Sequence, residues 1–334
     1  MKIFITGIAG FLGSHLADEF LSLGHEVIGV DNLIGGDIDN LNPRISFHKV
    51  DCLDLEKLNE LISGTDIVYH AACTPHEGLS VFSPAKIVNN TFQITANTLS
   101  AAIKNKVTRF VQCSSMARYG QQDKIPFEEN MQCKPQDPYG IAKYASELLI
   151  KNLCDTHSIE YVITVPHNII GARQKYDDPY RNVASIMTNR MLQNKPAYIY
   201  GDGEQMRCFT FIEDVISCLR EAGMRDGISG EIINIGPDSN YITINKLYEK
   251  LSNLLLFNKE PIYVKERPQE VKFATCSADK AKKLLGFKEK ISLDDGLKNL
   301  VEYIKSKGPK PFRYHMDLEI INKKTPKTWS EKLI

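Results

Sequence analysis

The sequence predicts an α/β protein built on a doubly wound parallel sheet, with a smaller α/β domain interleaved with it. Apolar β-rich runs alternate with helical segments through the first half, and the first run is followed by a glycine-rich turn. A chain of 334 residues is long enough for two domains or one large α/β unit. Basic and acidic residues both number 41, so no overall charge attracts nucleic acid or a membrane surface.

The first strand is expected at residues 2–6, and the turn Gly7-x-x-Gly10-x-x-Gly13 leads from it into a helix over residues 14–23. Glycines allow a pyrophosphate to approach backbone N–H groups at the start of a helix, where the helix dipole favours an anion. Strand, glycine turn and helix in this order predict a Rossmann-type dinucleotide-binding unit.

The second strand, over residues 26–30, places Asp31 about 20 residues past the glycines. A carboxylate at this position accepts hydrogen bonds from the ribose hydroxyls of a dinucleotide. No arginine directly follows Asp31, so a 2′-phosphate would meet a like charge there. The sequence therefore favours NAD over NADP.

Further strands are expected at residues 45–50, 67–70, 109–113 and 160–165. Ala71 and Ala72 follow one of them, where small side chains allow either a flat ligand or a closely packed helix. Asn90, near the start of a helix expected over residues 84–105, could reach a cofactor or cap that helix. Ser115 follows the strand at 109–113, at the sheet edge where ligands bind in open parallel sheets.

Tyr139 and Lys143 lie four residues apart in a segment with a helical pattern that begins at Pro138. This spacing puts the phenol and the ammonium on one helix face. A nearby positive charge favours an ionised phenol, whose ordinary pKa is about 10, so Tyr139 could act as a base. Taken alone, the pair is better explained as an ordinary feature of a half-buried helix. The glycine turn and Ser115 favour the catalytic interpretation.

The eight cysteines are scattered without C-x-x-C spacing, which predicts reduced thiols with no disulfide framework and no metal site. No apolar run reaches the roughly 18 residues that a membrane span needs. The segment from Met1 to Gly7 is too short for a signal peptide. We therefore expect a cytoplasmic protein without membrane association.

Taken together, these motifs resemble the extended short-chain dehydrogenase/reductase family, especially its nucleotide-sugar epimerases and dehydratases. The resemblance covers roughly residues 1 to 305. The matching motifs are Gly7-x-x-Gly10-x-x-Gly13, Asp31-Asn32, Asp51, His70-Ala71-Ala72, Ser114-Ser115 with Tyr119-Gly120, Tyr139-x-x-x-Lys143, Asn168, Gly201-Asp202-Gly203, Arg207-x-Phe209, Asn234-x-Gly236 and Arg267-Pro268.

The resemblance implies that Tyr139 is the catalytic acid/base, that Lys143 binds the nicotinamide ribose and lowers the Tyr139 pKa, and that Ser115 bonds the reacting sugar hydroxyl. The cofactor-binding residues that it implies are Gly7, Gly10, Phe11, Leu12, Gly13, Asp31, Asn32, Asp51, Cys52, Ala71, Ala72, Asn90, Tyr139, Lys143 and Pro166. The substrate-binding residues expected from it are Met116, Arg118, His167, Asn168, Asn182, Val183, Tyr198, Arg207 and Arg267. Two alternatives stay open: Arg118 on the surface and His167 in the core.

One departure from the family pattern bears on the reaction. The 4,6-dehydratases of the family carry Asp-Glu directly after the active-site threonine, because elimination needs a further acid and base. Here Met116 and Ala117 occupy those positions. We therefore expect an NAD-dependent nucleotide-sugar epimerase, acting at C4 of a UDP-hexose. A 4-ketosugar reductase or dehydrogenase is the alternative, a dehydratase or decarboxylase is less favoured, and an NAD-binding sensor or assembly subunit is the non-enzymatic alternative.

The resemblance also implies the domain organisation and the partners. An NAD-binding domain is expected at residues 1–170, joined by about 205–225, and a substrate domain at 171–204 and 226–305. Residues 306–334 form a C-terminal extension that is too apolar for a free tail. The expected partners are a nucleotide-diphosphate sugar and a second copy of the chain, the latter through helices that begin near Pro84 and Tyr139.

Overall fold

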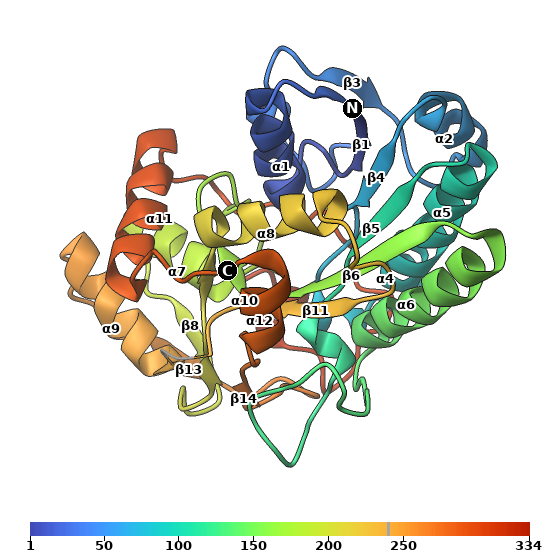
Figure 1. The fold of residues 1–334 in the computed structure, drawn as a ribbon. Coiled ribbons are helices and arrows are strands. Elements are labelled where there is room, and N and C mark those ends of the chain that lie inside the picture. The colour runs from blue at the N-terminus through green and yellow to red at the C-terminus, as the bar shows by residue number, and fades with distance from the viewer. Residues whose placement is uncertain (239–240) are drawn as a thin grey trace.

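A computed structural model describes residues 1–238 and 241–334. Its central sheet has seven strands in the order β11-β6-β5-β4-β1-β2-β3, and every neighbouring pair is parallel (Figure 1). The strands are β1 (Lys2–Thr6), β2 (Glu26–Asp31), β3 (Ser46–Lys49), β4 (Ile67–His70), β5 (Arg109–Cys113), β6 (Glu160–Pro166) and β11 (Ile232–Ile235). The strand order reverses beside β1, which creates a crevice at the carboxyl ends of the strands. The predicted doubly wound parallel sheet is confirmed.

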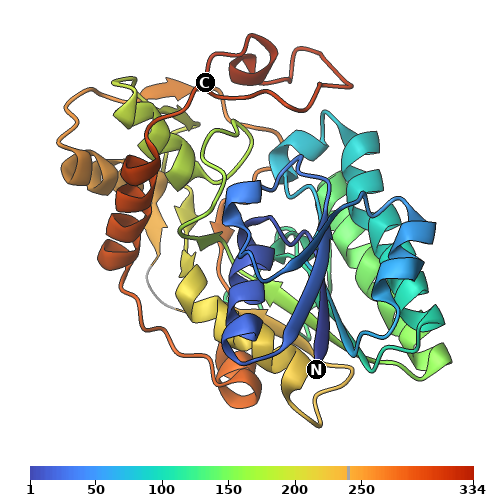
Figure 2. The same cartoon turned by 90° about the horizontal axis from the view of Figure 1, so that it is seen from above.

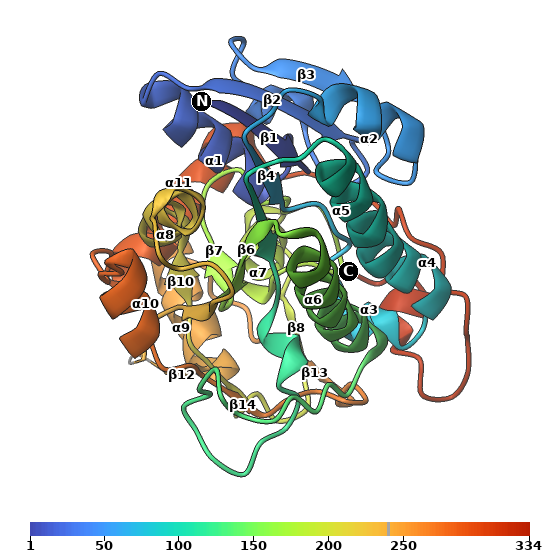
Figure 3. The ribbon, with the colours of Figure 1, turned by 45° about the vertical axis from the view of Figure 1, so that its right-hand side comes forward.

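Helices cover both faces of this sheet (Figure 3). On one face lie α1 (Phe11–Ser22), α8 (Ile212–Met224) and α10 (Asp279–Leu285), and on the other lie α2 (Leu55–Ile62), α5 (Ile94–Lys104) and α6 (Pro138–His157). The strands between them are rich in Ile and Val because both of their faces are buried. Within the described parts of the chain, no helix has the length and apolar composition needed to cross a membrane.

The helix expected over residues 84–105 is interrupted. After α4 (Pro84–Val88) the chain makes a π-helical turn at Asn89–Gln93 before it continues as α5. Asn90 is the residue that leaves helical geometry there, with φ −80° and ψ 15°. Such turns inside helices are frequent at functional sites, and Asn90 lines the cavity described below.

A second hydrophobic core lies beside the sheet, among α7 (Val183–Leu192), α9 (Ile244–Leu255) and α11 (Leu293–Lys307). Four short pairings accompany it: β8 (Tyr198–Tyr200) with β13 (Ile262–Val264), β7 (Ile169–Ile170) with β10 (Thr210–Phe211), and β9 (Met206–Arg207) with β12 (Ile242–Thr243) and β14 (Phe273–Ala274). Because α8 returns to the sheet between these elements, the two cores share the chain. The predicted division into domains stays a prediction.

Residues 308–334, here called the C-terminal segment, pack on the rest of the same chain (Figure 2). Lys310 donates a backbone hydrogen bond of 3.0 Å to Asn189 of α7, and Glu319 donates one of 2.9 Å to the carbonyl of Phe82. The segment passes α3 (Glu77–Ser80) and α4 and ends with α12 (Lys327–Ser330) beside β8. It thus connects the smaller core to the sheet side of the molecule.

Candidate active site

A cavity of about 450 Å³ opens at the carboxyl edge of the sheet. Its walls come from the segments after β1, β2, β4, β5 and β6 and from residues of the smaller core. Every residue that we predicted to contact the cofactor lines this cavity, as do Ser115, Asn168, Asn182, Val183, Arg207 and Arg267 from the catalytic and substrate sets. Residues from distant parts of the sequence therefore meet in one place.

The backbone of the glycine turn packs so closely against neighbouring backbone that a side chain larger than hydrogen would not fit there. Gly7 has φ +70°, and a Cβ added to it would lie 2.9 Å from the backbone of Ala72. A Cβ on Gly13 would lie 2.2 Å from the carbonyl oxygen of Gly7. Since α1 begins directly after Gly10, its free N–H groups face this close approach. A pyrophosphate fits such a cradle.

Two carboxylates lie next to the glycine turn. Asp31 accepts backbone hydrogen bonds from Ala9 at 3.1 Å and from Leu33 at 2.7 Å. Burial raises the pKa of Asp31, and these backbone donors act against that rise. Asp51 accepts a hydrogen bond of 2.9 Å from the amide of Asn32. Acceptors placed this way beside the turn fit the ribose hydroxyls of NAD.

Ser115, Tyr139 and Lys143 meet on the cavity wall, as the sequence predicted. Asp137 fixes the start of α6 because its carboxylate accepts a hydrogen bond of 3.0 Å from the backbone of Gly140. Lys143 then lies one turn past Tyr139, and its Nζ is 5.9 Å from the centre of the Tyr139 ring. The functional groups come from two elements, α6 and the loop after β5.

The pKa of Tyr139 differs from the expectation. Burial raises it well above its ordinary value, the neighbouring Cys73 adds to the rise, and a hydrogen bond with Ser115 opposes it. Lys143 donates its hydrogen bond to the carbonyl of Cys113 at 2.7 Å instead of to the phenol. The Tyr139 pKa is therefore raised, opposite to the predicted lowering, because desolvation of the phenolate is the largest effect on it.

Arg207 and Arg267 share one carboxylate in the cavity wall. Their Nη2 atoms lie 3.1 Å and 2.9 Å from the same oxygen of Glu270. Arg267 also lies over the ring of Tyr200, 4.8 Å from its centre. Both arginines therefore pair with Glu270. Two planar guanidinium groups side by side fit a diphosphate.

The N-terminus of α7 faces the same part of the cavity. Asn182 caps this helix by accepting a hydrogen bond of 2.9 Å from Ala184, and both Asn182 and Val183 line the cavity. Free N–H groups at a helix start favour an anion. A smaller cavity of about 90 Å³ adjoins this place and is lined by Tyr198, Arg190 and, from the C-terminal segment, Trp329.

Three of the predicted substrate contacts lie elsewhere: among the described residues, Met116, Arg118 and His167 line neither cavity. Met116 is in the hydrophobic core, in the 3-10 helix η3 (Met116–Arg118). Arg118 is buried in an ion pair with Glu147, so neither of the two alternatives, substrate contact or surface, holds. His167 is 2% exposed, and burial lowers its pKa to about 4, so its ring is neutral.

Sequence reasoning missed several cavity residues, above all His76, Glu77, Asp137 and His315. The side chain of Glu77 is exposed to the cavity, yet the walls surround it closely enough that desolvation, followed by Asp137, raises its pKa to about 7. The positive charge of Arg207 lowers the pKa of Glu77 and so opposes this rise. Asp directly before Pro138 is a helix-start signal that could have identified Asp137. Nothing in the sequence marks the other three.

A Rossmann sheet, a glycine cradle and a Ser-Tyr-Lys set in one cavity define an NAD-binding protein of the short-chain dehydrogenase/reductase class. The model of the NAD dependent epimerase/dehydratase family matches residues 3–236, and the chain belongs to this family. The resemblance inferred from the motifs is confirmed, as is NAD as the cofactor.

Relatives of known structure cover nearly the whole chain. The UDP-glucose 4-epimerase of Thermotoga maritima, solved with UDP-glucose, is 33% identical with a TM-score of 0.87, covering 92% of this chain and 99% of that one. The UDP-glucuronic acid 4-epimerase of Bacillus cereus, solved with UDP-glucuronic acid and NAD, is 30% identical with a TM-score of 0.85, covering 92% and 100%. A UDP-N-acetyl-alpha-D-glucosaminuronate decarboxylase of Bacillus cytotoxicus is 29% identical over 319 residues, 91% of this chain and 98% of that protein.

Proposed function

We propose that this protein is an NAD-dependent epimerase that inverts C4 of a UDP-hexose. The observation that supports the proposal is that Ser115 and Tyr139 line the same cavity as the glycine cradle and the Arg207–Arg267 pair. In this proposal one cavity holds a dinucleotide at the glycine cradle, a diphosphate at the arginine pair, and the acid/base group Tyr139. The similar proteins named for 4-epimerisation of UDP-sugars support this assignment.

In this proposal Tyr139 takes the proton from the C4 hydroxyl, and Ser115 holds that hydroxyl by a hydrogen bond. The chemistry that NAD supplies when bound is reversible hydride transfer. Tyr139 gives the proton back after the ketosugar has turned over in the cavity, so acid and base are the same group. Lys143, held by the carbonyl of Cys113, keeps a positive charge next to the phenol. The cycle is redox-neutral overall.

The diphosphate is the natural anchor of the substrate. Arg207, Arg267 and the start of α7 are the cationic and N–H groups that face this part of the cavity. Anchoring through the diphosphate leaves the sugar free to present either face to the acid/base group. This freedom is what an epimerase requires between its two half-reactions.

The test is product analysis by NMR after incubation with UDP-glucose, UDP-galactose, their N-acetylated forms and UDP-glucuronic acid. We expect a 4-epimer, no net absorbance change at 340 nm, and NAD(H) in the supernatant of heated protein. Tyr139→Phe should lose about 10²- to 10⁴-fold in kcat while it retains the cofactor. Tyr144→Phe, on the same helix, is the matched control and should keep full activity. Stoichiometric oxidation of added NADH would instead identify a ketosugar reductase.

Glu77 favours a second candidate, a dehydratase or decarboxylase. Its carboxyl faces the cavity, and its pKa of about 7 suits proton exchange near neutral pH. Met116 and Ala117 still leave the usual positions of the extra acid and base without a carboxylate. A product that has lost water or carbon dioxide would establish this candidate and overturn the epimerase.

We also propose that the protein forms a homodimer through α6 and α4. Ile141 and Leu148 lie two turns apart on α6 and are 52% and 53% exposed, and Val88 at the end of α4 is 37% exposed. Apolar residues at this spacing form a stripe that a second copy could cover. Sedimentation should give a dimer, and the pair Ile141→Glu and Leu148→Glu should give a monomer. A monomeric parent protein would refute the proposal.

A further inference from the structure

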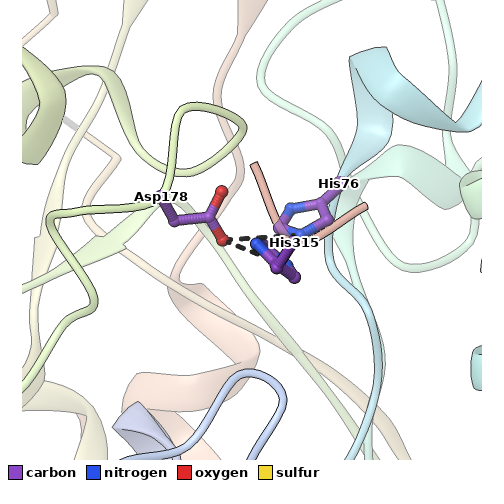
Figure 4. A group of neighbouring side chains, drawn as sticks. All are labelled: His76, Asp178 and His315. Carbon is purple, nitrogen blue, oxygen red and sulfur yellow. Dashed lines mark ion pairs between the residues drawn. The ribbon is translucent and has the colours of Figure 1, made fainter. Parts of the chain in front are cut away.

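Three side chains from separate segments meet at the wall of the main cavity: His76 just before α3, Asp178 before α7, and His315 in the C-terminal segment (Figure 4). The Nε2 atom of His76 is 3.6 Å from Oδ2 of Asp178, and the Nε2 atom of His315 is 3.7 Å from the same oxygen. One possible ligand atom from each residue lies within 4.8 Å of the other two.

This group is buried and its hydrogen bonding is incomplete. His76 is 2% exposed and Asp178 is 0% exposed. Oδ1 of Asp178 accepts a hydrogen bond of 2.9 Å from the backbone of Tyr180, which fixes the carboxylate. Oδ2 of Asp178 and Nδ1 of His76 have no hydrogen bond of good geometry among the described residues, and the backbone of Tyr180 is the one group that interacts with the His76 ring as a hydrogen-bond partner there. Buried polar atoms without partners are costly. Separations of 3.6 Å and 3.7 Å are too long for the two imidazoles to supply those bonds.

The same separations suit a shared cation. Ligand atoms about 2.0 to 2.1 Å from a tetrahedral zinc ion lie about 3.4 Å from each other. The two N···O separations would need to shorten by only a few tenths of an ångström. The two imidazole nitrogens, which lie within 4.8 Å of each other, would have to approach as the rings turn onto the ion. Imidazole nitrogens with a carboxylate oxygen are a donor set that zinc accepts readily. Burial lowers the pKa of His76 to about 3, so its ring is neutral, which is the form that binds metals.

We propose that His76, Asp178 and His315 bind one divalent transition-metal ion, preferably zinc, which ties the C-terminal segment to the wall of the active-site cavity. Three protein ligands leave one position of a tetrahedral ion open. His76 and His315 both line the cavity, so the ion would lie at its wall. The proposal does not depend on which sugar nucleotide the enzyme uses.

Arg181 supplies the competing explanation. Its Nε lies 3.5 Å from the same Oδ2 of Asp178, so a guanidinium could neutralise the buried carboxylate without a metal. A metal-bound carboxylate can also accept from Arg181 on a remaining lone pair, as outer ligands commonly do. If Arg181 alone neutralises Asp178, the protein should not bind zinc. If the metal site exists, the protein should bind zinc, and the binding should depend on His315.

The direct test uses untagged full-length protein that has been treated with EDTA and dialysed. Zinc is titrated in competition with a chromophoric chelator, and bound metal is counted by mass spectrometry after desalting. We expect one zinc per chain in the parent and in His157→Ala, which removes an exposed histidine at the end of α6. His315→Ala should bind more than about tenfold more weakly, since loss of an outer-shell partner alone costs 10- to 100-fold.

His315→Ala is chosen because His315 is 18% exposed in the C-terminal segment, and circular dichroism should confirm that the variant is folded. Limited proteolysis provides a second measurement. Zinc should protect residues 308–334 of the parent and of His157→Ala from cleavage, but not those of His315→Ala. Equal zinc affinity in parent and His315→Ala, or a parent that binds no zinc, would overturn the site. Zinc binding without protection would overturn its role in holding the segment.

Discussion

Arg118 and Glu147 form an ion pair inside the protein, with Nη2 of Arg118 3.0 Å from Oε2 of Glu147 and side chains that are only 4% and 3% exposed. Glu147 belongs to α6 and also accepts a hydrogen bond from the hydroxyl of Ser114. The pair therefore joins the loop that carries Ser115 to the helix that carries Tyr139 and Lys143. We expect the pair to position these groups.

Arg118→Met should destabilise the protein by about 3–5 kcal/mol, because it leaves the Glu147 carboxylate buried without its partner. Urea unfolding of the cofactor-bound protein measures the change. Combining Arg118→Met with Glu147→Leu should recover most of the loss, since no buried charge remains. If Arg118→Met instead kept its stability and raised KM alone, Arg118 would be a substrate contact.

Glu77→Gln should abolish a pH dependence of substrate binding. The carboxyl of Glu77 has a pKa of about 7 against an ordinary value of 4.5, so it gains its charge as the pH rises from 6 to 8. A charged Glu77 then competes with the diphosphate for Arg207 and Arg267, so KM of the parent should increase over this range. Glu77→Gln should show a flat profile, and Glu56→Gln, on the exposed side of α2, should follow the parent.

The same titration affects stability. The folded protein holds the Glu77 proton more tightly than the unfolded chain, because the pKa is raised from 4.5 to about 7. This stabilising contribution is complete below about pH 4.5 and is lost as the pH rises through about 7. The difference in unfolding free energy between the parent and Glu77→Gln should therefore change between these two pH values. A constant difference would place the Glu77 pKa outside this window.

The sequence predicted those parts of the site whose residues lie close together in the chain and form a recognisable motif. The glycine turn needs three residues in one short segment, and Asp31 lies at the end of the next strand, so both follow from one strand-turn-helix pattern. Tyr139 and Lys143 are one helical turn apart. The parallel sheet follows from the alternation of strands and helices, and the family resemblance supported it.

The parts that sequence reasoning missed depend on how distant segments pack. Arg118 meets Glu147 only because α6 lies against η3, and the pKa of Tyr139 depends on how many atoms exclude water from its phenol. His76 and His315 are brought together by the path of the C-terminal segment, which no motif describes. The cysteine pattern that argued against a metal site carries no information about histidines from different loops.

Arg207→Met and Arg267→Met should each weaken UDP binding by about tenfold to a hundredfold, since a hydrogen bond to a charged group contributes about 1.5–3 kcal/mol. Isothermal titration with UDP measures this directly. The double variant should lose more than the sum, because Glu270 would then repel the diphosphate without a counter-charge. Arg225→Met, at a guanidinium that is 43% exposed, should bind UDP like the parent. Equal UDP affinities in the parent and all four variants would show that the diphosphate does not bind at this place.

Trp329→Ala should loosen the C-terminal segment without unfolding the sheet. The indole is 3% exposed, and its ring centre lies 5.6 Å from that of Tyr180 and 6.2 Å from that of Phe82. Losing such a buried side chain costs about 3–5 kcal/mol, and we expect this loss to weaken the packing of residues 308–334 on the rest of the protein. Amide hydrogen exchange should accelerate in this segment and stay slow in β1, β4 and β5. Ile321→Ala, at a residue that is 68% exposed in the same segment, should leave exchange unchanged. Equal acceleration throughout the sheet would show that the segment is part of one cooperative unit with the rest of the protein.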